Sequence, residues 1–158
     1  MKKIPLTQGM CALADDEDYE YLNQWKWYAA KQHNGYYAFR SDYSTGKVKT
    51  IRMHKEILTE EKDIDHKDGN GLNNQKYNIR YCTHPQNHQN RKHHKNCSSI
   101  YKGVSLCFSK WRAQIMFDGK VKHLGLFSEE KEAALAYDKK AMEVFGVFAR
   151  VNFSPMEE

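Results

Sequence analysis

The sequence predicts an α+β protein of two parts, and three observations support this prediction. The 158-residue chain is 40% hydrophobic and 13% aromatic with a mean hydropathy of −0.88, a composition typical of folded proteins with small cores. Strand-like aromatic runs precede a polar stretch rich in Asn, Asp and Gly at residues 64–90. Strand-like runs and an amphipathic helix follow it. We therefore expect domains at residues 1–92 and 100–154, joined by a basic linker at 93–99.

The first part shows local signals for a hairpin and a short helix. The first forty residues are rich in aromatic side chains, and Asn34-Gly35 is a turn signal between two aromatic runs. Thr83 and Gln86 stand at the spacing of a capping box, so a short helix is expected to begin near His84.

The second part shows the pattern of a three-stranded antiparallel sheet packed on one helix. Asp118-Gly119 is a strong hairpin signal between two of its strand-like runs. Ser128 is the expected N-cap of a helix that ends at Gly146. The expected strands are Gly103–Phe108, Trp111–Phe117 and Lys120–Phe127.

Positive charge is concentrated in the second part of the chain. The whole chain has a formal charge of +5, but residues 91–123 hold eight Lys and Arg residues against Asp118 alone, a net charge of +7. A polyanion is the natural partner of such a segment, because its binding releases counterions. An ordinary solvated basic face is the alternative interpretation. No segment is long and apolar enough to span a membrane.

The polar central stretch contains the residues that hydrolysis of a phosphodiester requires. If Asp65 and His66 end a strand, their side chains project to opposite faces, so one can bind a metal ion and the other can face a water molecule. Asn87, near the start of the expected helix, offers a second oxygen ligand, and such ligands suit Mg²⁺ or Mn²⁺ better than zinc. The same Asp-His pair would also fit an exposed turn.

The segment DHKDGNGLNNQKYNIRYCTHPQNHQN resembles the H-N-H endonuclease motif of phage and intron-encoded homing enzymes. The resemblance implies a ββα-metal catalytic domain in which His66 is the general base. It further implies that Asn78 hydrogen-bonds across the loop to hold His66, and that Asp65 and Asn87 bind the divalent ion. Many members of the family have a second histidine at the position of Asn87, although a variant with Asn is known.

Three further histidines lie near this motif. His84 and His88 flank the position of Asn87 and are alternative metal ligands, which we rank below it. The stretch RMHKEIL, which contains His54, resembles a segment that precedes the motif in relatives. We expect His54 to pack in the core beside the site.

The stretches YKGV, KWRAQI, HLGLF, EAALAYDKKA and FG..A.VNF, between Tyr101 and Phe153, resemble the plant Apetala-two/ethylene-response-factor domain. That domain lays its three-stranded sheet in the major groove of DNA, while its helix packs behind. Several of the plant arginines are absent here, so the plant target sequence should not be inherited. The residues matching its DNA-contacting positions are Lys102, Ser105, Cys107, Gln114, Met116 and His123, with Lys110, Arg112, Lys120 and Lys122 as expected phosphate contacts. Arg91 and Lys92 belong to the basic stretch that is expected to track DNA. The expected core is Trp111, Leu124, Phe127, Ala134, Tyr137 and Phe153.

Together, these patterns and resemblances predict a metal-dependent, homing-type DNA endonuclease. One active site per chain predicts a nick, unless dimers or two binding events cut both strands, and the H-N-H resemblance implies a 5′-phosphate and a 3′-hydroxyl as products. Its expected partner is duplex DNA, with no membrane and no small-molecule cofactor, in a monomer or weak dimer. The expected location is the cytoplasm of a bacterial or phage-infected host cell. The alternatives are a DNA-binding regulator with an inactive nuclease motif, and an RNA-binding protein, which the charge and the exposed aromatic residues fit equally well.

Overall fold

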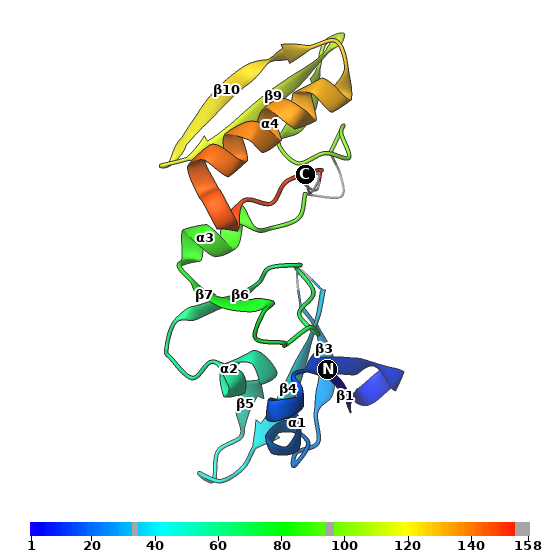
Figure 1. Ribbon diagram of the computed structural model, residues 1–158, viewed down its shortest axis with the longest axis vertical. Coiled ribbons are helices and arrows are strands. Elements are labelled where there is room, and N and C mark those ends of the chain that lie inside the picture. Colours follow the sequence, from blue (N-terminus) through cyan, green and yellow to red (C-terminus); the bar gives the residue numbers. More distant parts are fainter. Residues whose placement is uncertain (33–34, 94–96, 154–158) are drawn as a thin grey trace. The chain divides into compact units, whose positions relative to one another are not determined.

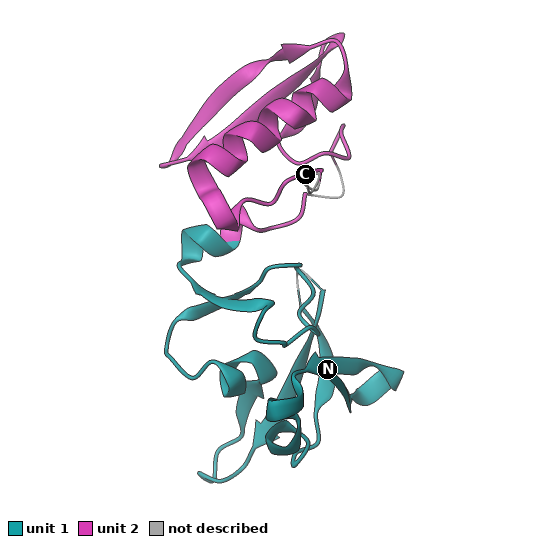
Figure 2. Cartoon of the chain, viewed as in Figure 1, with its two compact units in different colours: residues 1–87 teal, residues 88–158 magenta. Residues whose placement is uncertain are grey.

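The computed structural model describes residues 1–32, 35–93 and 97–153, which fall into two compact units (Figure 2). Unit 1 is Met1–Asn87 and unit 2 is His88–Glu158. The elements form a mixed structure of short helices and small antiparallel sheets, in agreement with the expected α+β class. No helix among the described residues is long and apolar enough to cross a membrane.

Unit 1 contains three small antiparallel sheets, β1-β2, β3-β4-β5 and β6-β7 (Figure 1). Its strands are β1 (Lys2–Pro5), β2 (Cys11–Ala14), β3 (Tyr28–Gln32), β4 (Gly35–Asp42), β5 (Lys49–Arg52), β6 (Asp63–His66) and β7 (Ile79–Cys82). Its helices are the short η1 (Thr7–Gly9), α1 (Asp16–Leu22), α2 (Met53–Ile57) and α3 (His84–Gln89), of which α3 continues into unit 2. The expected hairpin joins β3 to β4 at Gly35, while Asn34 lies outside the described residues.

One hydrophobic cluster connects the N-terminal strands of unit 1 to its helices. Its buried members are Ile4, Ala12, Ala14, Leu22, Trp27, Ala38 and Met53. The indole N–H of Trp27 donates to the backbone oxygen of Leu22 at 2.7 Å, so the one polar atom of this side chain is satisfied inside the core. Much of the aromatic N-terminal part thus forms the core of unit 1.

In unit 2, a three-stranded antiparallel sheet in the order β10-β9-β8 packs one face on α4 (Figure 1). The elements are β8 (Val104–Cys107), β9 (Lys110–Phe117), β10 (Lys120–Phe127), α4 (Glu130–Phe145) and the short η2 (Gly146–Phe148). Asp118 and Gly119 both have positive φ angles, of 51° and 70°, as the hairpin signal predicted. All six residues expected in the core belong to the two clusters between the sheet and α4.

The start of α4 differs from the expectation. The N-cap is Glu129, whose backbone is extended (φ −106°, ψ 137°), and the prediction of Ser128 was one residue too early. Phe127 is the last residue of β10 and packs into the core, so the chain uses two residues to turn from the strand into the helix. The helix ends at Gly146, which is its C-cap with a φ of 53°, as predicted.

The division between the units falls before the linker expected at 93–99, of which residues 94–96 lie outside the described residues, as does residue 154. Residues 88–91 belong to unit 2, and the Lys102 ammonium bonds their backbone. Its Nζ donates to the backbone oxygen of Gln89 and, at 2.7 Å, to that of Arg91.

Asp138 of α4 fixes the last described residues of unit 2 to the helix. Its carboxylate is buried and accepts hydrogen bonds of 2.8–2.9 Å from the backbone and side-chain N–H groups of Asn152 and from the backbone N–H of Phe153. The Asn152 carboxamide in turn bonds the backbone of Lys102. A single buried carboxylate therefore connects the helix, the C-terminal segment and the start of the sheet.

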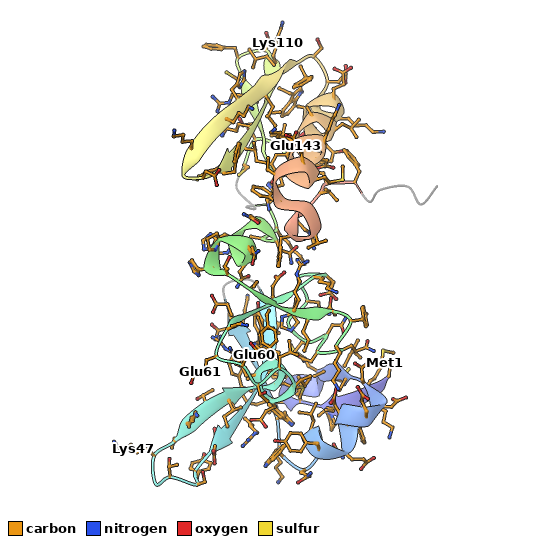
Figure 3. The ribbon with its side chains drawn as sticks, turned by 60° about the vertical axis from the view of Figure 1, so that its left-hand side comes forward. Met1, Lys47, Glu60, Glu61, Lys110 and Glu143 are labelled. Atoms are coloured by element: carbon orange, nitrogen blue, oxygen red, sulfur yellow. The ribbon has the colours of Figure 1, made fainter. Side chains whose placement is uncertain are left out.

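Replacing Asp138 with alanine is expected to lower the free energy of unfolding of unit 2 by about 3 kcal/mol, because three N–H donors lose a charged acceptor. Native-state hydrogen exchange of the β9 and α4 amides measures this change separately from unit 1. The control is Glu143→Ala on the exposed side of the same helix (Figure 3), which should change it by less than about 0.5 kcal/mol. Equal effects of the two substitutions would contradict this role of Asp138.

Candidate active site

The Asp65-His66 pair ends β6, as the sequence analysis required. β6 pairs with β7 in a register that sets Asp65 opposite Arg80 and His66 opposite Ile79, and α3 follows β7 (Figure 1). Successive side chains of a strand point to opposite faces, so the side chains of the consecutive residues Asp65 and His66 lie on opposite faces of the hairpin. Both are buried, with exposed fractions of 5% and 4%.

The loop from residue 67 to 78, which joins β6 to β7, is closed by its own polar side chains. Asn78 is buried, and its side-chain NH₂ donates to Asp68 Oδ1 at 3.0 Å and to the backbone oxygen of Asn73 at 2.8 Å. Its Oδ1 accepts the backbone N–H of Asp68 at 3.1 Å. Asn and Asp commonly build turns in this way. Asn78 thus bonds across the loop, but to Asp68 and Asn73 rather than to His66 as the resemblance implied, and it fixes the loop that carries Asn74.

Asn74, which the sequence analysis did not single out, forms a side-chain hydrogen bond to the His66 imidazole. Its Oδ1 lies 3.2 Å from His66 Nε2, and its NH₂ group lies 3.5 Å from the sulfur of Met53. Asn74 and Met53 are both almost completely buried. The carboxamide oxygen only accepts, so this contact favours the tautomer with the proton on Nε2, in which Nδ1 is the basic nitrogen.

The N-terminal hairpin of unit 1 holds this loop in place. Leu13 of β2 donates its backbone N–H to Leu72 at 2.8 Å and accepts that of Asn74 at 2.9 Å. The Asp15 carboxylate accepts the backbone N–H of Lys76 at 2.7 Å and the side-chain NH₂ of Gln75 at 3.0 Å. The backbone of Asn74, and with it the acceptor for His66, is therefore positioned by residues about sixty positions earlier in the chain.

Tyr37, His54 and His66 form a cluster of three rings, which we call the histidine cluster. The centroids of His54 and His66 are 5.0 Å apart, and Tyr37 packs edge-on against both at 6.1 and 5.7 Å. Gly71 borders the cluster, because a Cβ atom there would come within 2.4 Å of the Tyr37 ring. His54 is buried beside the site, as expected.

Burial keeps both imidazoles of the cluster uncharged. It lowers the pKa of His54 to about 3 and places the pKa of His66 below its ordinary value, although the bond to Asn74 and the charges of Asp68 and Asp65 act in the opposite direction. A neutral imidazole can accept a proton at neutral pH. His66 therefore has the protonation state that a general base needs.

Asp65 and Arg80 form a buried ion pair across the β6-β7 hairpin. The Nε and Nη2 of Arg80 lie 2.9 and 2.7 Å from Asp65 Oδ2. A buried carboxylate without such a partner would favour protonation. Arg80 thus supplies the opposite charge that the buried Asp65 carboxylate needs.

The helix that follows β7 begins with the predicted capping box. The Thr83 backbone N–H donates to Gln86 Oε1 at 2.8 Å, and the Gln86 backbone N–H donates to Thr83 Oγ1 at 3.4 Å. Asn87 is half-buried on this helix, while His84 and His88 are exposed.

The residues expected to hold a metal ion are one carboxylate, Asp65, and one carboxamide, Asn87. The described residues contain no group of three His, Cys, Asp or Glu side chains arranged for a metal ion. Mg²⁺ is commonly held by only one or two oxygen ligands of the protein, together with water and substrate phosphate. The charge and the oxygen donors of this pair are chemically suited to such an ion.

The side chains expected to contact DNA fall on both faces of the sheet of unit 2. Ala113 and Ile115 of β9 pack in the clusters against α4, so the alternate residues of this strand face the other way. We call this second face the open face. By the strand register it carries Ser105, Cys107, Lys110, Arg112, Gln114, Met116 and His123.

The remaining cations lie elsewhere. Lys120 and Lys122 are opposite Phe117 and Ile115 in the register, so they share the α4 face. Lys102 binds the two backbone oxygens described above, and burial near Arg150 lowers its pKa to about 8.

The two basic residues of the expected DNA-tracking stretch differ in exposure. Arg91 is half-buried and its backbone oxygen accepts the bond from Lys102, while Lys92 is exposed.

No family model matches the chain. A protein of Acanthamoeba polyphaga mimivirus, named as an uncharacterized HNH endonuclease, is 30% identical over 151 residues, which span 92% of this chain and 76% of that protein. The similarity therefore includes the β6-β7 hairpin, its loop and α3 as well as most of unit 2. By this similarity over nearly its whole length, the chain belongs to the HNH endonucleases.

Proposed function

We propose that the chain is a divalent-metal-dependent endonuclease of the homing type that nicks one strand of duplex DNA. The observation that carries this proposal is the buried His66, hydrogen-bonded to Asn74 and adjacent to the buried Asp65 at the end of β6. The order β6, β7, α3 is compatible with a ββα-metal unit. The named relative supports the nuclease class of this activity.

In the proposed reaction, His66 Nδ1 removes a proton from a water molecule. The water oxygen forms a bond to phosphorus and the bond to the 3′ oxygen breaks, which leaves a 5′-phosphate and, after protonation by solvent, a 3′-hydroxyl. When bound at Asp65 and Asn87, the divalent ion supplies positive charge that stabilises the phosphorane and the leaving oxygen. Asn74 is a positioning residue, because it fixes which nitrogen of His66 carries the proton.

Unit 2 is proposed to be an Apetala-two/ethylene-response-factor-like domain that binds duplex DNA. Its sheet packed on one helix and the net charge of +7 over residues 91–123 support this assignment. Lys110, Arg112, Gln114 and His123 of the open face are the proposed DNA contacts within the sheet. Arg91 and the exposed Lys92 are proposed to add phosphate contacts. One active site in a monomer or weak dimer predicts nicks rather than double-strand breaks.

The proposal is tested by conversion of supercoiled plasmid to open circles. We expect conversion with Mg²⁺ or Mn²⁺, none with EDTA, and a rate at least about 100-fold lower for His66→Ala, because general-base catalysis is lost while DNA binding in a gel shift is retained. A DNA ligase should reseal the nicks, which requires a 5′-phosphate beside a 3′-hydroxyl.

The regulator alternative makes the opposite prediction for this assay. Wild-type protein that shifts duplex DNA but leaves plasmid, phage and host DNA intact with either ion would establish a DNA-binding protein and contradict the nuclease. Stronger binding to RNA than to duplex DNA of the same sequence would favour an RNA-binding protein instead.

Asn74→Leu is expected to lower kcat by about 100-fold with KM nearly unchanged, because the leucine side chain has a similar branched shape but no longer accepts the His66 proton. The control is Asn70→Ala in the same loop, whose exposed side chain accepts the backbone N–H of Leu72. It should retain activity within about threefold. Equal losses in both variants would indicate a general disturbance of the loop and would contradict the role of Asn74.

A further inference from the structure

The open face of unit 2 has three large exposed apolar side chains, Met116, Val121 and Leu126. Their exposed fractions are 66%, 61% and 51%. Met116 and Val121 are direct partners in the β9-β10 register, and Leu126 pairs with Arg112. Isolated apolar residues are common on protein surfaces, but a set on one sheet face indicates an interaction surface.

Polar groups between and beside these side chains indicate what they contact. Gln114 pairs with His123 on the same face, one step along the sheet from Met116 and Val121. A Gln carboxamide can donate to N7 and accept from N6 of adenine, while apolar side chains fit the methyl group of thymine. Guanine is usually read by Arg or Lys, and neither occupies the positions of Gln114, His123, Met116 or Val121.

The cations of the open face lie toward one end. Lys110 begins β9 at the β8-β9 turn (Figure 3), and Arg112 follows two residues later on the same face. The Arg112 guanidinium donates to Ser105 Oγ at 3.3 Å, which holds it against the sheet. This arrangement places positive charge beside the apolar and amide surface, complementary to a phosphate backbone that borders a groove.

We propose that the open face reads A·T base pairs in the major groove of duplex DNA. Gln114 recognises adenine, Met116, Val121 and Leu126 contact thymine methyl groups, and Lys110 and Arg112 contact phosphates. The inference rests on the proposed binding of duplex DNA by unit 2, and it adds the base composition of the target.

The experiment is selection of duplexes from a random library by the full chain in EDTA, which prevents cleavage. We expect the selected duplexes to share an A·T-rich core. Replacing its thymines by deoxyuridine should weaken binding about fourfold for each methyl group contacted, since each is worth about 0.8 kcal/mol. Replacing its A·T pairs by inosine·cytosine, which resembles A·T in the minor groove only, should abolish the preference.

Matched variants connect this preference to the open face. Leu126→Ala and Met116→Ala should bind thymine and deoxyuridine duplexes more equally. Leu135→Ala should leave the preference for thymine duplexes unchanged, because Leu135 is as exposed (50%) as Leu126 but lies on α4. Gln114→Ala should weaken binding to the selected core about tenfold.

If plasmid nicking is intact, selection of a G·C-rich core would overturn the inference. Equal binding of the thymine, deoxyuridine and inosine duplexes would overturn it as well. Absence of any duplex binding by the wild-type chain would instead contradict the proposed function of unit 2.

Discussion

The hydrogen bond between Asn74 Oδ1 and His66 Nε2 is the interaction on which the geometry of the candidate active site depends. It decides which nitrogen of a buried, neutral imidazole is basic. The bond exists because Asn74 is fixed twice, by its side chain against Met53 and by its backbone against Leu13. The N-terminal hairpin and α2 are therefore as necessary to the site as the polar loop itself. This explains why a short catalytic segment requires a much longer folded unit around it.

Burial has two consequences in the candidate active site, one for the histidines and one for Asp65. It lowers the pKa of both histidines of the cluster, which keeps His66 a base, and it requires a partner for the charge of Asp65, which Arg80 supplies. In unit 2 the buried charge of Asp138 has a structural role, since it anchors the C-terminal segment to α4. That anchoring supports the sheet from the α4 side and leaves the open face to a partner. Each unit thus uses buried polar groups to fix the surface that is proposed to contact DNA.

The sequence predicted those features that a few neighbouring residues determine. The Thr83 and Gln86 capping box and the Asp118-Gly119 turn formed as expected, because their geometry depends on residues within four positions. The partner of His66 could not be chosen in this way: several asparagines stand in the loop, and only contacts with β2 and α2 bring Asn74 to the imidazole. Lys102 was likewise interpreted from its charge, whereas its surroundings bury it against the backbone of residues 89–91.

The tautomer of His66 tests the central claim most directly, because it reports the bond to Asn74 without any assay of activity. Long-range ¹H–¹⁵N correlation spectra of histidine-labelled protein at pH 7 distinguish the two nitrogens, and loss of signals in a His66→Gln variant assigns them. We expect a neutral ring with the proton on Nε2 and an unprotonated Nδ1. A proton on Nδ1, or a ring protonated on both nitrogens, would contradict the assignment of Asn74 as the residue that orients the base.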